Sequence, residues 1–136
     1  MTTMTKLNEA QVALLKAKNF AFVGTLMPDG SLQVSPMWVE YDGEHVILNS
    51  EVKRTKVKNM QRDPRVTVCV SNAENPYEYL EIRGRVVAMT TDGAFEGIDM
   101  LAKKYLGQDK YPMNQPGDQR IIIKVEPTRV VGYTGS

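Results

Sequence analysis

The sequence predicts a mainly β protein, a small closed β-barrel with peripheral helices. Runs rich in β-branched and aromatic residues recur along the 136-residue chain, and tight-turn sequences such as "PDGS" (28–31) and "DG" (42–43) separate them. Gly84 interrupts one of these runs, as residues at barrel corners do. We therefore expect six antiparallel strands in a single domain that spans residues 1–136.

The expected strands cover residues 20–27, 32–41, 44–50, 65–72, 77–90 and 119–133. Pro36 lies within the second strand and cannot donate a hydrogen bond to a neighbour. That strand is therefore expected to be an edge strand, or to break or bulge at Pro36. Pro127 raises the same question for the last strand.

Three helices are expected between the strands, over residues 8–18, 55–62 and 91–107. Asn8 and Gln11 have the spacing of a capping box for the first helix. Asp63-Pro64 ends the second, because the residue before a proline avoids the helical region. The third carries apolar residues at helical spacing.

Composition narrows the classes of function. The chain has 17 basic and 16 acidic residues, a balance that argues against a nucleic-acid partner. No apolar run approaches the ~20 residues of a membrane span, and the first residues do not resemble a signal peptide. Cys69 is the single cysteine and lies among valines, so we expect it in the core and expect the chain in the reducing cytoplasm.

No set of residues in the sequence indicates catalysis by side chains alone. His45 is the only histidine, and with one cysteine it gives little support for a metal site, so none is expected. Neither a Gly-x-Ser-x-Gly nucleophile motif nor a phosphate-binding Gly-x-x-x-x-Gly-Lys-Ser motif occurs. We therefore predict no catalytic residues, and if the protein is an enzyme a cofactor carries the chemistry.

A basic segment, "NSEVKRTKVKNMQRDPRV" (49–66), stands out in a chain whose net charge is only +1. Arg54, Thr55 and Lys56 fall at the start of the second expected helix, where free backbone N–H groups and the helix dipole favour an anion. Cations are unfavourable at that end without a counter-charge, so a bound phosphate is one interpretation. A solvated basic helix face is the other, and the charges alone do not decide between them.

The order of several motifs resembles the split-barrel flavin and deazaflavin oxidoreductases, the relatives of pyridoxamine 5′-phosphate oxidase. These motifs are "PDGS", "VSPMW", "VILNS", "KRTK", "NMQRDPRV" and "YLEIRGRV". The resemblance runs from about Leu7 to Tyr133 and implies an antiparallel FMN-binding split barrel. "SPMW" followed by "NSEVKRTK", "DPRV" and "IDMLAKKYLG" is most similar to the branch that uses coenzyme F420, an 8-hydroxy-5-deazaflavin.

The resemblance also implies a binding site and a partner. Members of the family are homodimers with cofactor sites at the subunit interface. Carried over to this chain, the cofactor-binding residues are Ser35, Pro36, Met37 and Trp38 at the ring, Asn49 and Ser50 near the ring and its side chain, Arg54, Thr55 and Lys56 at the phosphate, and Tyr79 reaching the partner's cofactor. Lys56 is the firmest match, because its spacing to "DPRV" agrees with the family. "Arg-Thr-Lys" (54–56) departs from the Ser-Arg-Lys common in the flavin oxidases, so the roles of Arg54 and Thr55 are less well matched.

The implied activity is hydride transfer between reduced F420 and a small electron-poor organic acceptor. An FMN enzyme with the same barrel is the alternative within this class. Outside it, the chain could be a non-catalytic cofactor or haem-binding protein, or a small nucleic-acid-binding barrel. The near-neutral net charge and the scarcity of aromatic residues count against the last of these.

Overall fold

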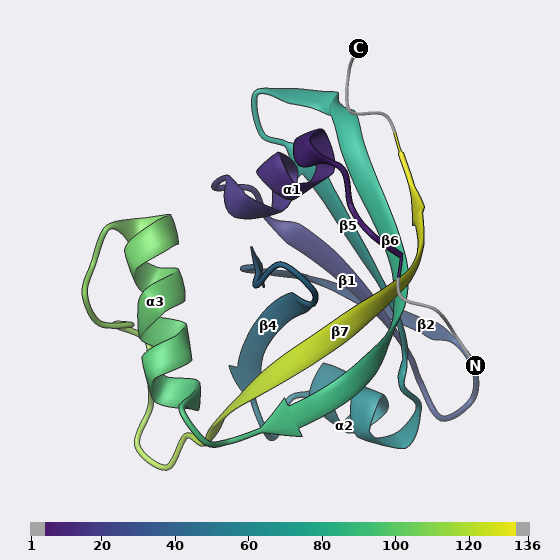
Figure 1. Ribbon diagram of the computed structural model, residues 1–136. Helices are drawn as coiled ribbons and strands as arrows, with labels where there is room; N and C mark the ends of the chain where they lie inside the picture. Colours follow the sequence, from purple (N-terminus) through teal and green to yellow (C-terminus); the bar gives the residue numbers. More distant parts are fainter. Residues whose placement is uncertain (1–4, 133–136) are drawn as a thin grey trace.

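The computed structural model describes residues 5–132, which form one curled antiparallel sheet with three helices outside it (Figure 1). The sheet has seven strands in the order β2-β1-β5-β6-β7-β4-β3. Their bounds are β1 Ala21–Leu26, β2 Leu32–Met37, β3 Glu40–Tyr41, β4 Val46–Glu51, β5 Arg65–Asn72, β6 Asn75–Thr90 and β7 Arg120–Val131. The mainly β barrel class is confirmed; the predicted end of the last strand, Tyr133, lies outside the described residues.

The predicted count of six strands was wrong, because the strand expected over 32–41 is divided into β2 and β3. β2 pairs only with β1, so Pro36 lies in an edge strand, as its missing N–H requires. At Trp38 and Val39 the chain leaves β1, and β3 pairs with β4 instead. The N–H of Val39 donates to the hydroxyl of Tyr105 (3.1 Å) rather than to a strand.

The two edges of the sheet therefore meet along what we call the seam, the gap between β2 and β3 that Trp38 and Val39 bridge. Three Cα–Cα steps of about 3.8 Å separate Met37 from Glu40, so the edges lie within roughly 11 Å of each other there. Such a close approach of the two edge strands, β2 and β3, requires the sheet to curl almost into a ring.

The core fills the inside of the curl, where alternate residues of each strand point inward. Val66, Val68 and Val70 of β5 are all buried there, as expected from their shared parity. Cys69 has the opposite parity and is only partly buried, so the prediction that it belongs to the core was wrong. Successive side chains of a strand point to opposite faces, so valines at every second position point into the core and Cys69, between two of them, points outward.

Gly84 provides the predicted bend. The pairing of β6 with β7 shifts between Arg83 and Gly84, and Pro127 lies opposite Gly84 without ending β7. A Cβ atom at position 84 would lie 2.6 Å from the carbonyl oxygen of Glu126. Only glycine permits this close approach of the two backbones.

The three helices lie close to their predicted positions. α1 (Glu9–Lys16) has the predicted capping box between Asn8 and Gln11. α2 (Thr55–Arg62) has its predicted bounds, and α3 (Ala94–Leu106) begins three residues later than predicted. No helix within residues 5–132 is both long and apolar enough to cross a membrane.

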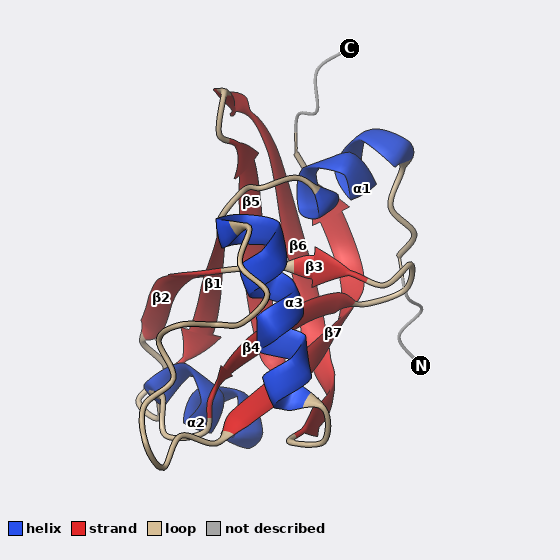
Figure 2. Cartoon of the chain, turned by 90° about the vertical axis from the view of Figure 1, so that its left-hand side faces the viewer, coloured by secondary structure: helices blue, strands red, loops and turns tan. Residues whose placement is uncertain are grey.

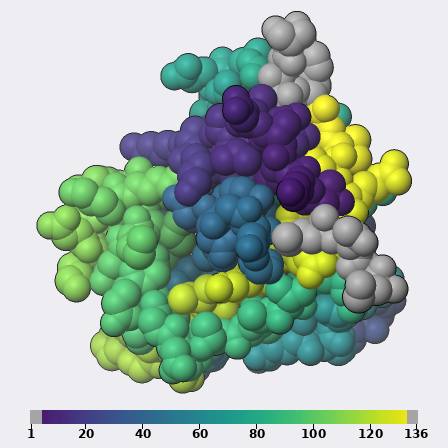
Figure 3. Space-filling view, in the orientation of Figure 1, coloured from purple at the N-terminus to yellow at the C-terminus, as the bar shows by residue number. Residues whose placement is uncertain are grey.

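α3 stands outside the sheet, beside β4 and β7, and projects at one side of the molecule in the space-filling view (Figures 2 and 3). Its buried residues Ile98, Leu101 and Tyr105 form a second small cluster with Trp38 and Tyr111. This cluster fixes α3 and the loop after it against the seam, where the cleft described next is found.

Candidate functional site

A cleft of about 510 Å³ lies at the seam, between the end of β2, the end of β4, the start of α2 and the face of α3. We call it the seam cleft. Of the predicted site residues, seven line it: Pro36, Met37, Trp38, Asn49, Ser50, Arg54 and Lys56. These seven lie within residues 36–56, and the curl of the sheet brings them together with residues as distant in the sequence as Phe20 and Arg120.

One end of the seam cleft is aromatic and apolar. The indole of Trp38 stacks on the ring of Tyr105, with ring centroids 5.2 Å apart and planes 6° from parallel. The ring of Tyr111 meets Trp38 edge-on at 5.7 Å. Contacts on two sides hold the indole in one orientation, so the wall beside Pro36 and Met37 is flat and rigid.

The other end is cationic. Arg54 occupies the N-cap position of α2 and makes no side-chain capping bond, although small polar residues are the usual caps. Lys56, in the first turn, donates from Nζ to Oγ of Ser35 on β2 (2.9 Å). Burial, helped by the charges of Arg54 and Arg120, lowers the pKa of Lys56. Three cations, Arg54, Lys56 and Arg120, therefore converge beside the N-terminus of α2.

Arg120, the first residue of β7, is the third of these cations and is buried. Its Nε donates to Oδ1 of Asn49 (3.0 Å), and its guanidinium lies 5.1 Å from the centre of the Tyr111 ring. Burial lowers the pKa of Arg120, against the opposing effects of Tyr111, Asp118 and Glu51.

Among residues 5–132, Glu51 is the only acid that lines the seam cleft. Its carboxylate accepts hydrogen bonds from the backbone N–H groups of Gln119 (3.1 Å) and Lys53 (2.8 Å). These bonds lower the pKa of Glu51, so the carboxylate stays ionised and fixes the two loops beside the cleft. It is not poised to donate a proton.

The remaining predicted residues lie around the cleft or away from it. Ser35 adjoins it through Lys56, and Thr55 begins α2 without lining the cleft. Tyr79, near the start of β6, is 38% exposed and does not line the cleft of its own chain.

Six lining residues were not predicted: Phe20, Glu51, Ile98, Tyr111, Met113 and Arg120. Arg120 stands directly before the apolar run "IIIKV", and a charge at the start of a buried strand was a usable indication. Tyr111 and Met113 belong to the loop after α3, whose path no local pattern indicates. No group of acidic, histidine or cysteine side chains within residues 5–132 could hold a metal ion.

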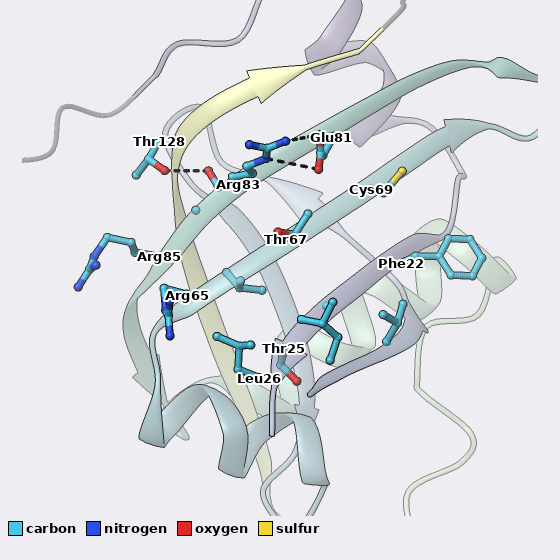
Figure 4. Close-up of a pocket in the computed structure, with 15 residues that line it drawn as sticks. Phe22, Thr25, Leu26, Arg65, Thr67, Cys69, Glu81, Arg83, Arg85 and Thr128 are labelled. Carbon is cyan, nitrogen blue, oxygen red and sulfur yellow. Dashed lines mark hydrogen bonds and ion pairs between the residues drawn. The ribbon is translucent and has the colours of Figure 1, made fainter. Parts of the chain in front are cut away.

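A second hollow, of about 720 Å³, lies on the outer face of β1, β2, β5 and β6 (Figure 4). Its lining includes the exposed apolar side chains of Phe22, Leu32 and Val34. Cys69 is also in its lining, and burial together with the charge of Glu81 raises the pKa of its thiol. A protonated thiol on an apolar face is typical of a contact surface rather than of a nucleophile.

Comparison with known proteins gives one family. The model of the pyridoxamine 5′-phosphate oxidase family matches residues 7–132. A comparison with curated proteins found no match.

Among solved structures, one named F420 reductase is 33% identical, with a TM-score of 0.81 over 92% of this chain and 98% of its own. A protein from Listeria innocua, described as a putative pyridoxamine 5′-phosphate oxidase, is 19% identical, with a TM-score of 0.68 over 90% of this chain and 94% of its own. HupZ from Group A Streptococcus is also 19% identical, with a TM-score of 0.65 over 96% and 99%. The last two share the fold.

Proposed function

The chain belongs to the pyridoxamine 5′-phosphate oxidase family, and from this membership we propose that it is an oxidoreductase that uses coenzyme F420. One observation carries the proposal: the seam cleft joins a flat aromatic wall at Trp38 to three converging cations at the start of α2. A planar ring system that carries a phosphate has these two features. The 33% identity with the structure named F420 reductase favours a deazaflavin.

In this proposal the ring lies against Pro36, Met37 and Trp38, and the phosphate lies at the N-terminus of α2. Lys56 and Arg54 provide the charge. The backbone N–H groups of Thr55 and Lys56 provide donors, since the first N–H groups of a helix have no partner within it. Thr55 thus contributes through its backbone, although its side chain does not line the cleft.

When bound, the cofactor supplies hydride transfer to or from a small electron-poor organic acceptor. The chain's own residues orient the ring, screen it from water and balance its negative charge. Since Glu51 is held ionised by two backbone N–H groups, we assign no proton donor to the chain and expect water to supply the proton.

FMN is the second candidate, because the family model is that of an oxidase and the cationic end would take an FMN phosphate equally well. F420 differs by carboxylates beyond its phosphate. The exposed cations Lys53, Lys58 and Arg62 would meet them, with a modest gain in affinity that fades at high salt.

Titration of the purified protein with F420 and with FMN tests the proposal, with heat or fluorescence as the readout. We expect both to bind and F420 to bind more tightly, with the difference shrinking as salt is added. Tight FMN binding without measurable F420 binding would transfer the assignment to the second candidate. Absence of binding by either would reject both.

We also propose that the protein is a homodimer, with the face around the second hollow covered by a second copy of the chain. Leu32 is 75% exposed, Val34 61% and Phe22 49%, which is unusual for apolar side chains on one sheet face. Family membership favours a second copy over another partner. Tyr79, which lies outside the cleft of its own chain, would then reach the cofactor of the other subunit.

A further inference from the structure

Arg120 is a buried charge with one hydrogen bond. Its side chain lines the seam cleft although the residue is only 8% exposed. Within residues 5–132 the sole hydrogen bond of this side chain is the one from Nε to Asn49, and the side chain belongs to no ion pair. A guanidinium has five N–H donors, so the outer edge formed by Nη1 and Nη2 is left for a molecule in the cleft.

The guanidinium is held in a fixed orientation. Asn49 presents Oδ1 to it because the Nδ2 of the same amide donates to the carbonyl oxygen of Ala94 (2.8 Å). Gly97 leaves room for this amide, since a Cβ atom there would lie 3.1 Å from Nδ2. The Tyr111 ring covers the guanidinium from another side. Such support resembles the positioning of a binding group more than ordinary core packing.

The neighbouring acids are engaged elsewhere. Both carboxylate oxygens of Glu51 accept backbone N–H groups, and the carboxylate of Asp118 accepts the N–H of Gln115 (2.7 Å). Arg54 and Lys56, in contrast, add positive charge beside Arg120. The charges of Glu51 and Asp118 offset part of this, but neither carboxylate forms an ion pair with Arg120. A buried cation without a direct partner is unfavourable unless an anion joins it.

We infer that Arg120 is a third oxyanion-binding residue of the seam cleft, beside Arg54 and Lys56, and that its Nη edge takes the paired oxygens of a phosphate or carboxylate on the bound molecule. Asn49, for which the family resemblance implied a cofactor contact, is in this inference a positioning residue that fixes the guanidinium. The inference rests on the proposed function for the identity of the bound molecule. Arg120 and its supporting groups belong to β4, β7 and α3, whereas Arg54 and Lys56 belong to the start of α2.

The test compares Arg120→Met and Arg120→Lys with Arg129→Met, a matched control that removes an exposed arginine from the same strand. Each variant is titrated with F420, which carries phosphate and carboxylates, with FMN, which carries phosphate alone, and with riboflavin, which carries neither. Loss of a hydrogen-bonded charge pair should weaken binding about ten- to a hundredfold. We expect that loss in Arg120→Met, partial recovery in Arg120→Lys because lysine lacks the planar fork, and no change in Arg129→Met.

The ligands identify the oxyanion. Weakening of F420 and FMN together assigns a phosphate to Arg120, and weakening of F420 alone assigns a carboxylate; either supports the inference. Equal weakening of riboflavin, or unchanged binding of all three, would overturn it. Removal of an unpaired buried charge should leave the melting temperature of the ligand-free protein unchanged or raise it. If Arg120→Met does not fold, the comparison of ligands is made with Arg120→Lys.

Asn49 is tested through its coupling to Arg120. Asn49→Ala alone should weaken binding of the same ligands, and in the Arg120→Met background it should have no further effect. A merely structural role would lower affinity in both backgrounds. If wild-type protein binds neither F420 nor FMN, the proposed function fails, and inorganic phosphate becomes the probe. A phosphate-induced rise in melting temperature that Arg120→Met loses still supports the oxyanion site, and one that it keeps overturns it.

Discussion

Lys56 brings together burial, two neighbouring cations and a helix N-terminus, and all three disfavour its positive charge. If the cluster holds a phosphate, Lys56→Ala should weaken cofactor binding by about ten- to a hundredfold, which corresponds to a charged hydrogen bond of roughly 1.5–3 kcal/mol. The ligand-free protein should keep its melting temperature or gain slightly. Calorimetric titration paired with thermal melts measures both.

Lys58→Ala is the matched control, because Lys58 lies on the same helix and is exposed. It should change affinity far less than Lys56→Ala. If Lys56→Ala leaves affinity unchanged, the segment is a solvated basic face and the phosphate assignment fails. A marked fall in the melting temperature of the ligand-free variant would indicate a packing role instead.

The same lysine gives a pH dependence with a definite sign. Its pKa in the folded protein lies below the ordinary 10.5, so as pH rises the folded protein releases this proton before the unfolded chain does. The free energy of unfolding of ligand-free wild type should therefore rise relative to that of Lys56→Ala between neutral pH and about pH 10.5. Urea midpoints of the two proteins along this range measure the difference, and a constant difference would contradict the perturbed pKa.

The functional role of some residues can be predicted from the sequence, and that of others cannot. Lys56 was found because cations in the first turn of a helix contradict a local rule, and that contradiction is visible within a few residues. Arg120 was missed because its meaning depends on Asn49, 71 residues away. Cys69 was placed wrongly because its apolar neighbours were considered without the alternation of a strand.

At the scale of elements, Tyr105 ties α3 to the seam. Its hydroxyl accepts the N–H of Val39 (3.1 Å) and donates to the carbonyl oxygen of Asn19 (2.6 Å). Tyr105→Phe should destabilise the protein by about 1–3 kcal/mol, because the buried N–H of Val39 loses its acceptor. The ring that stacks on Trp38 remains, so cofactor affinity should change little.

Urea unfolding of Tyr105→Phe measures this cost, with Tyr77→Phe as the control, since Tyr77 is 83% exposed. The control should match wild type. An unchanged free energy of unfolding in Tyr105→Phe would mean that water or another group satisfies Val39.

Element positions followed from the sequence where the determinant is local. α2 was predicted with its true bounds because Asp63-Pro64 ends it. The start of α1 was predicted correctly from the Asn8–Gln11 box, whereas its end was predicted two residues too late. The division into β2 and β3 could not be predicted, because the acceptor of the Val39 N–H comes from α3, 66 residues later. The same distance hid the contribution of α3 and its following loop to the cleft.

At the scale of the whole molecule, the exposed apolar face predicts a dimer with an interface above the ~2,000 Å² typical of obligate pairs. Sedimentation at micromolar concentration should give twice the mass of 15.3 kDa. Leu32→Glu should shift the protein toward the monomer, because it places a charge in a dry interface. Met100→Glu on α3 is the control, since Met100 is likewise 75% exposed. A monomeric wild type would reject the proposal.

The seam has a further consequence, for motion. The sheet is curled almost into a ring, and its two edge strands are joined by only two residues, so local opening is easiest where the edges meet. The middle strands are hydrogen-bonded to a neighbour on both sides. A molecule seated against β2, β4 and α2 together would act as a clasp on that opening. The amide protons of β4 and Val39 should then exchange more slowly when the cleft is occupied, whereas those of β5 and β6 should keep their exchange rate. Binding in the cleft would thus stabilise the part of the sheet that opens most easily in the ligand-free protein.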